Sequence, residues 1–374
     1  MGLSWWGPDG VWYGPEGAYP GGVTVANTPE GVSAEMLRRH LIALGGVTMV
    51  GAPVERLGEL LAELPGPAAE PLPSQLSGIH VAQVRDLTRR LGIGDTGWAD
   101  PQVSSAAAAQ ASRLLDVPGP ARVRQALLVA VAELHSEAGW SAFDAGLYRR
   151  ALYHYARTLE LATEAGDRYL QALGLRYAGL ASVEHGHPGD GLKMLQCAQV
   201  KAWDISADDQ RAVVVGVSGR AAAEACALQE SATAFACLGD LEAAVIHLAR
   251  GRDLWTPART DPFGDMDRPA AWLELARGRL DVAEALAAAS LRRWGGGRQL
   301  SRTLSGIVQA TVHVTAGERD GLQMAHQVIT TVAQLSSVRV RNQLTPLAKA
   351  LAARPGSDAK ELARMAQQVS TTPA

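Results

Sequence analysis

The chain has 374 residues, 47% of them hydrophobic but only 5% aromatic, with a net charge of −3. This length and hydrophobic content are enough for two or three domains or for one long helical array. The near-neutral charge argues against a strongly basic, autonomous nucleic-acid binder. Three cysteines without CxxC spacing, Cys197, Cys226 and Cys237, predict free thiols in a reducing cytosol rather than a disulfide framework or a zinc site.

Residues 1–32 form an N-terminal segment rich in glycine, proline and tryptophan. The runs Gly7-Pro8-Asp9-Gly10 and Gly14-Pro15-Glu16-Gly17 are typical β-turn sequences, and an aromatic pair precedes each of them. The pattern indicates a turn-rich aromatic segment that either packs on a neighbouring surface or becomes ordered on binding.

Residues 33–74 predict a helical segment followed by a proline-rich linker. One helix is expected from Ser33 to Leu44 and another from Pro53 to Leu64, with the linker at 65–73. Arg38-Arg39 and the apolar run that follows resemble a twin-arginine leader. That run is about 14 residues long, shorter than the ~20 needed to span a bilayer. We therefore expect a buried helix in a cytoplasmic protein, without a membrane partner.

From about residue 75 to residue 370 the pattern is helical throughout, with helices expected near 80–91, 103–115 and 120–144 before a repeat region. Residues 92–97 match GxGxxG, the fingerprint of a dinucleotide site. That fingerprint requires a preceding strand. Because the preceding residues have a helical pattern, the glycines are expected to end a helix and turn the chain.

A glycine marker recurs in the second half of the chain at Gly146, Gly186, Gly239, Gly278 and Gly317. The successive intervals are 40, 53, 39 and 39 residues. A small residue stands seven positions before each marker, and another stands five positions after the first four. At the fifth, Leu322 takes that place and puts the unit out of phase. Small residues let two antiparallel helices approach to ~8–10 Å. The spacing therefore predicts an all-α, tetratricopeptide-like helical-repeat solenoid of about five helix pairs. The long interval predicts an inserted turn or extended helices around residues 203–212.

Several stretches in this order resemble the long helical portion of actinobacterial helix-turn-helix regulators of the XRE type. They are MLRRHLIALGGVTMVGAP, then LLVAVAELHSEAGWSAFDAGLYRRALYHYARTLELATEAGDRYLQA, ACLGDLEAAVIHL and SSVRVRNQLTPLAKAL. The resemblance covers about nine-tenths of the chain and implies a regulatory, ligand-sensing role. Those regulators begin with a DNA-binding domain, which does not fit the residues before Arg38. The expectation is that the chain lacks this module or starts downstream of it, and that DNA is a partner only if an upstream helix-turn-helix exists.

No sequence motif predicts catalysis, a metal site or a cofactor. His185 and His187 predict a solvated turn rather than metal ligands. Asp261, Asp265 and Asp267 predict a loop with helix-capping carboxylates. The arginines at 292, 293, 298 and 302 predict a basic helix end beside a flexible turn.

A repeat solenoid binds its partners on the concave face, which the first helix of each pair lines. Counting from the small residue before each marker nominates one set of groove positions. They are Ser136, Trp140, Asp144, Arg176, Leu180, Glu184, Gln229, Arg268 and Trp272. The groove reading suits a peptide, a small-molecule ligand or a protein partner. The competing reading makes Trp140 and Trp272 core residues between repeats. The rival functions are a DNA-binding regulator, a helical-repeat enzyme and an assembly scaffold, and a homodimer stays open.

Overall fold

The computed structural model describes residues 72–92, 100–205, 219–255, 265–294 and 299–371, together with three short strands near the N-terminus. The described helices follow one another along the chain and confirm the all-α class. The N-terminal helices are α3 (Gly78–Leu91), α4 (Pro101–Arg113), the 3₁₀ helix η1 (Leu114–Asp116), α5 (Ala121–Asp144) and α6 (Tyr148–Glu164). The middle helices are α7 (Arg168–Glu184), α8 (Pro188–Trp203), α9 (Gly219–Cys237), α10 (Leu241–Leu254), α11 (Asp267–Ala276) and α12 (Leu280–Trp294). The C-terminal helices are α13 (Gln299–Thr315), α14 (Gly321–Ala333), α15 (Val338–Asn342), α16 (Thr345–Ala353) and α17 (Ser357–Thr371).

Five helix pairs turn at the predicted glycines: α5–α6, α7–α8, α9–α10, α11–α12 and α13–α14. Gly146 has φ +76°, and the other four marker glycines also have positive φ. In each turn the residue after the glycine donates its N–H to the carbonyl five positions back, as Leu147 does to Ala142 at 2.8 Å. This is the glycine-ended Schellman cap, which satisfies carbonyls that the helix end leaves free. The shared geometry confirms that the spacing marks one structural unit.

Small residues sit where the two helices of a pair approach most closely. A Cβ built on Gly191 in α8 would lie 2.7 Å from the carbonyl oxygen of Gly179 in α7, and one on Gly139 would lie 2.4 Å from the Tyr155 ring. In the fifth pair the close contact falls at Gly321, whose Cβ would lie 2.9 Å from the α13 backbone. The small position there is four residues after Gly317 instead of five. Leu322 therefore looked out of phase in the sequence although the helix pair is present.

The sequence missed two further glycine turns. Gly166, with φ +67°, joins α6 to α7, and Gly356 joins α16 to α17 in a sixth pair. The long interval between Gly186 and Gly239 arises after α8, in residues that lie outside the described ranges. The predicted helices at 33–44 and 53–64, the linker at 65–71 and Arg38-Arg39 also lie outside them.

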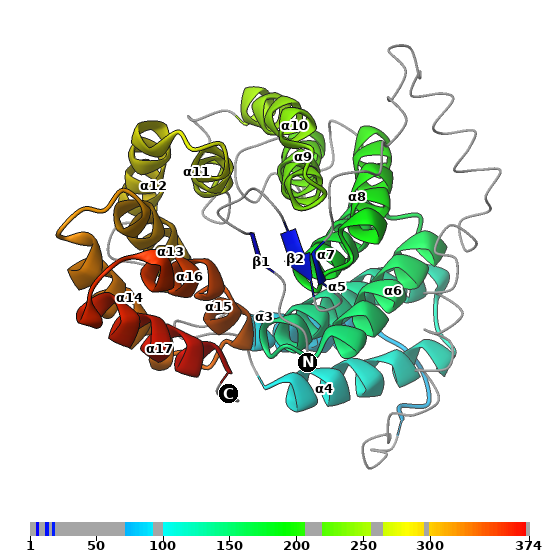
Figure 1. Ribbon diagram of the computed structural model, residues 1–374. Coiled ribbons are helices and arrows are strands. Elements are labelled where there is room, and N and C mark those ends of the chain that lie inside the picture. The colour runs from blue at the N-terminus through cyan, green and yellow to red at the C-terminus, as the bar shows by residue number, and fades with distance from the viewer. Residues whose placement is uncertain are drawn as a thin grey trace.

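The helix pairs follow one another around a ring, with the first helix of each pair toward its centre (Figure 1). The ring closes because α15, near the C-terminus, packs against α5, near its start. The apolar core is a series of clusters along the ring, with the largest around α5 and around α13 to α17. We call the side of the ring that faces its centre the inner face.

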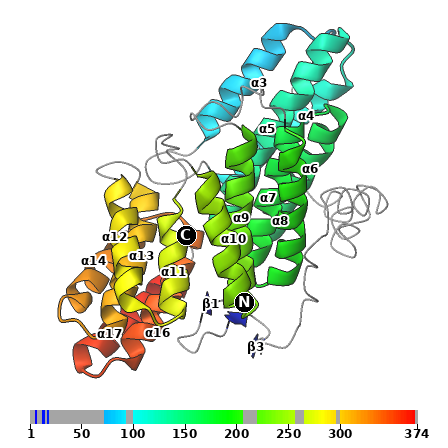
Figure 2. The same ribbon diagram turned by 90° about the horizontal axis from the view of Figure 1, so that it is seen from above.

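A small antiparallel sheet of β1 (Trp5–Trp6), β2 (Trp12–Gly14) and β3 (Gly17–Ala18) lies at the end of the ring away from α3 (Figure 2). Trp5 pairs with Tyr13, and Tyr13 in turn pairs with Ala18. The strands flank the two predicted turn sequences. β1 contacts α16, so the N-terminal segment reaches the C-terminal part of the array. Among the described helices, none is both long enough and apolar enough to cross a bilayer.

Replacing Gly191 by alanine is expected to lower the free energy of unfolding by about 2 kcal/mol or more, because the new methyl group would meet the α7 backbone. Gly189 lies in the same helix with open space around its Cβ position. Gly189→Ala is therefore the matched control and is expected to be neutral or stabilising by up to ~1 kcal/mol. Urea denaturation of both variants checks this. Equal losses would contradict the close-approach explanation.

Candidate functional site

Residues from four separate helices meet on the inner face around the ion pair of Glu184 and Arg339. Arg339 of α15 donates from Nε and Nη2 to the two carboxylate oxygens of Glu184 at 2.9 and 3.1 Å. Its guanidinium carbon lies 5.5 Å from the ring centre of Trp140 and 5.2 Å from that of Phe143, within cation–π range. A side-on bidentate pair between two aromatic rings fixes both the position and the plane of the guanidinium.

A second ion pair lies beside the first. Arg176 of α7 donates from Nε and Nη2 to Oε1 of Glu230 in α9 at 2.8 and 2.7 Å. The Arg176 guanidinium also lies 5.0 Å from the centre of the Tyr177 ring, which in turn packs edge-on against Trp140. The Glu230 side chain is only 6% exposed. Burial raises the pKa of Glu230, and the charge and hydrogen bond of Arg176 oppose that shift.

A buried hydrogen bond closes the ring at the end of α5. Ser337, just before α15, donates to Oδ1 of Asp144 at 2.6 Å and also accepts from the N–H of Val340. Burial raises the pKa of Asp144, while the Ser337 hydrogen bond and the charge of Arg339 lower it in part. The hydroxyl therefore joins the first repeat to the start of a helix 193 residues later.

We call these residues, together with Glu137 and Tyr155 described below, the inner-face cluster. Its members are Glu137, Trp140, Phe143, Asp144, Tyr155, Arg176, Tyr177, Glu184, Glu230, Ser337 and Arg339. Four of the nominated groove residues belong to it: Trp140, Asp144, Arg176 and Glu184.

The other nominated residues are not members of this cluster, although Arg268 and Leu180 lie next to it. Arg268 lies in the first turn of α11, with its Nε 3.8 Å from Oδ2 of Asp265. Burial lowers the pKa of Arg268, and the charges of Asp265, Arg339 and Glu184 also act on it. Arg268 therefore lies at the edge of the cluster. Ser136 is buried in α5, Leu180 packs in the apolar cluster around Tyr155, and Gln229 is half-buried on α9. Trp272 packs into the apolar cores between α11 and α13, so the core reading fits this tryptophan better than the groove reading.

Sequence reasoning missed the partners that complete the cluster. Glu230 directly follows the nominated Gln229. The predicted register of α9 was one residue too early, so it selected Gln229 in place of Glu230. Ser337 and Arg339 could not be placed, because only the closure of the ring brings α15 onto α5 and α7. The predicted helix-capping loop is confirmed at Asp265, which accepts from the backbone N–H groups of Asp267 and Arg268.

A buried chain of hydroxyl and imidazole groups connects α4, α5 and α6. Ser105 contacts Nε2 of His154, the two histidines meet at Nδ1, and Nε2 of His135 contacts Ser112, each at 2.9 Å. Burial, with a contribution from the charge of Arg150, lowers the pKa of His154 to about 3. Burial also lowers the pKa of His135 well below its ordinary value. Two neutral imidazoles satisfying each other indicate a structural cross-link between helices.

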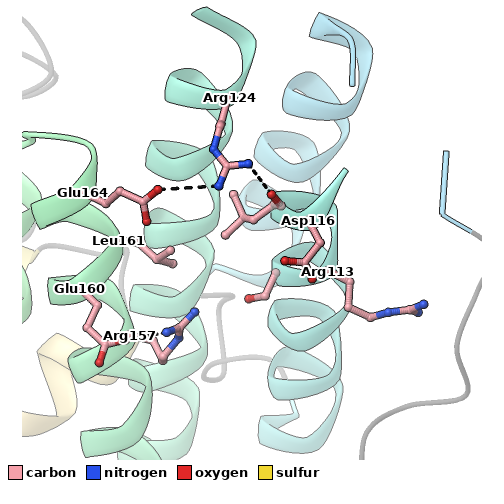
Figure 3. Close-up of a pocket in the computed structure, with 9 residues that line it drawn as sticks. Arg113, Asp116, Arg124, Arg157, Glu160, Leu161 and Glu164 are labelled. Carbon is pink, nitrogen blue, oxygen red and sulfur yellow. Dashed lines mark hydrogen bonds and ion pairs between the residues drawn. The ribbon is translucent and has the colours of Figure 1, made fainter. Parts of the chain in front are cut away.

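A pocket of about 500 Å³, which we call the outer pocket, is lined by residues of α4, η1, the start of α5 and the second half of α6 (Figure 3). Its charged groups are engaged with one another: Arg124 donates to the carbonyl of Leu115 at 2.6 Å and lies 3.8 Å from Glu164, and Arg157 pairs with Glu160. These side chains are largely exposed, and Arg113 points away from the others. Water screens such pairs, so the pocket offers a weaker recognition surface than the inner-face cluster.

Arg176→Ala is expected to lower the free energy of unfolding by about 3 kcal/mol, because Glu230 would stay buried without its cation. The double variant Arg176→Met with Glu230→Leu removes both charges and is expected to recover most of that loss. Chemical denaturation of the single and double variants measures the difference. A double variant no more stable than the single one would contradict the assignment.

Glu137 gives a pH-dependent prediction. Burial, with the nearby charge of Glu133, raises the pKa of Glu137 from 4.5 to about 7. The folded chain therefore holds this proton more tightly than the unfolded chain, and stability is lost as pH rises from about 4.5 through 7. Glu137→Gln is expected to gain about 1–2 kcal/mol relative to the parent chain at pH 8, and to gain little at pH 5. Glu361→Gln on α17, where the side chain is exposed, is the control. A gain of the same size at both pH values would show that burial of the Glu137 carboxylate is not the cause.

Comparison with known proteins leaves the inner-face geometry as the main basis for a function. No family model, curated protein or solved structure matches the chain. The likeness to XRE-type regulators therefore stays an expectation drawn from the residues quoted above.

Proposed function

We propose that the chain is a regulatory or sensor protein that binds a peptide, a small ligand or a protein partner at the inner-face cluster. The observation that carries the proposal is the convergence of Trp140 from α5, Arg176 and Glu184 from α7, and Arg339 from α15. An aromatic face beside fixed, directional ion pairs is the composition of a recognition site. The side chains of Arg176, Glu184 and Arg339 keep between 15% and 22% exposure, so a ligand can reach them.

The cluster suits recognition better than bond making. Each of its guanidinium groups is paired with a carboxylate. Its aromatic rings offer a contact surface for a ligand rather than a reactive group. Within the described residues, no three His, Cys, Asp or Glu side chains come together as metal ligands. The proposal keeps the expectation drawn from the sequence, a non-catalytic binding protein of the cytoplasm. The sequence resemblance supports a role like that of the sensor portion of XRE-type regulators.

Trp140→Ala is expected to reduce retention of a co-purified ligand or partner at least tenfold, because the substitution removes the main aromatic surface of the cluster. Affinity purification followed by mass spectrometry of proteins and small molecules measures the retention. Trp140→Phe keeps an aromatic ring and separates loss of contact from loss of packing. Arg157→Ala in the outer pocket is the control variant. Unchanged retention by a folded Trp140→Ala protein would rule out the inner face as the binding site.

A further inference from the structure

Arg339 and its neighbours are held on the inner face in the way that a bound peptide would be held. The Arg339 side chain is clasped by the Glu184 carboxylate and two aromatic rings, and the Ser337 hydroxyl by Asp144. Between them Val338 packs on the turn at Gly146, where even a Cβ would lie only 2.8 Å from the valine methyl. Three consecutive side chains are thus recognised one by one by α5, α7 and the turn after α5.

The surroundings of Arg339 contain oxygen atoms that no described group satisfies. Oε2 of Glu230 and the hydroxyl of Tyr155 are both buried without a hydrogen-bond partner. Tyr155 as a whole residue is only 1% exposed, and the Glu230 side chain only 6%. Leaving such groups unpaired costs about 1–3 kcal/mol each, so native proteins rarely retain them without a reason.

These atoms belong to one locality. Burial raises the pKa of Tyr155, and the charges of Tyr177, Arg339, Glu137 and Glu184 also act on it. Glu230 in turn lies within the influence of Arg176, Glu184 and Arg339. The contacts place them as well: the Tyr155 ring lies 5.6 Å from the Tyr177 ring, which also contacts Trp140 and Arg176, the partner of Glu230. Tyr155 and Glu230 therefore lie beside the two ion pairs.

The hydrogen-bonding groups of the cluster indicate the kind of ligand that fits it. Oε2 of Glu230 is an acceptor without a donor, and the Glu184 carboxylate would lose two donors if Arg339 moved away. The guanidiniums of Arg176 and Arg339 are already engaged by carboxylates. An anionic ligand would find its cations occupied. A ligand that carries N–H donors and positive charge would find the open Oε2 of Glu230, the place of Arg339 on Glu184, and aromatic faces.

We propose that the inner-face cluster is a recognition site for the arginine side chain of a peptide, and that Arg339 occupies part of this site as an internal stand-in until the ligand displaces it. The inference rests on the proposed function and names its ligand class. The helix that carries Arg339 has only five residues, so its displacement would not require a long helix to unpack.

The test uses the full-length chain and a synthetic peptide that copies residues 336–342, SSVRVRN, with acetylated and amidated ends. Arg339→Met empties the guanidinium position while keeping the apolar stem. By isothermal titration calorimetry, this variant is expected to bind the peptide at least tenfold more tightly than the parent chain does. A matched peptide with neutral citrulline in place of the arginine that corresponds to Arg339 is expected to bind at least tenfold more weakly. Adding Glu184→Gln to the variant is expected to remove the preference for arginine.

Equal binding of the two peptides by a folded Arg339→Met protein, or no binding of either, would overturn the proposal. Circular dichroism establishes that the variant is folded. If it is not, Ser337→Ala loosens the same segment by removing the Asp144 contact and leaves Arg339 in place. The parent chain and this variant are then compared, and no gain in peptide affinity overturns the proposal.

The outcomes separate this inference from the proposed function. A co-purified ligand that depends on Trp140 but carries no cationic group would leave the binding function standing and refute the arginine site. A folded chain that retains no ligand and binds neither peptide would refute both.

Discussion

The close approach of paired helices is the constraint on which the structure depends. At each turn a glycine with positive φ reverses the chain and lets the next N–H satisfy a helix-end carbonyl. On either side of the turn, small residues such as Gly179 and Gly191 let the two backbones come nearly into contact. A side chain at either place would separate the helices and change the angle between successive pairs. The curvature of the ring therefore follows from a few positions where almost no side chain is tolerated.

That curvature places the functional chemistry. Because the pairs follow a ring, α15 returns to α5, and Arg339 reaches Glu184 and Trp140 across a long stretch of sequence. The resulting cluster combines well-made contacts with unsatisfied ones: two bidentate or forked ion pairs lie beside buried oxygens that have no partner. A purely structural clasp would gain nothing from the unsatisfied groups. A site that exchanges an internal arginine for an external one would use them when the ligand is bound.

The sequence predicted the fold well because its strongest signals are local. The glycine and small-residue offsets depend on contacts within one helix pair, so Gly146, Gly186, Gly239, Gly278 and Gly317 were all placed at turns. The site was predicted in part: Trp140, Asp144, Arg176 and Glu184 follow from helix phase. Whether Arg339 and Ser337 reach α5 and α7 depends on how far the whole ring closes. That closure is the sum of the rotations between many successive helix pairs, and no local sequence pattern indicates the sum. Trp272 shows that helix phase alone can also select a residue wrongly, since a tryptophan on the first helix of a pair can fill the space between repeats.

Hydrogen–deuterium exchange in the presence of an arginine-containing peptide tests the central claim most directly. Binding at the inner face should protect the C-terminal halves of α5 and α7, where Trp140 and Glu184 lie, and should speed exchange in residues 337–342 as α15 leaves its place. Protection confined to the outer helices of the pairs, or unchanged exchange in both α5 and α15 at saturating peptide, would contradict the account.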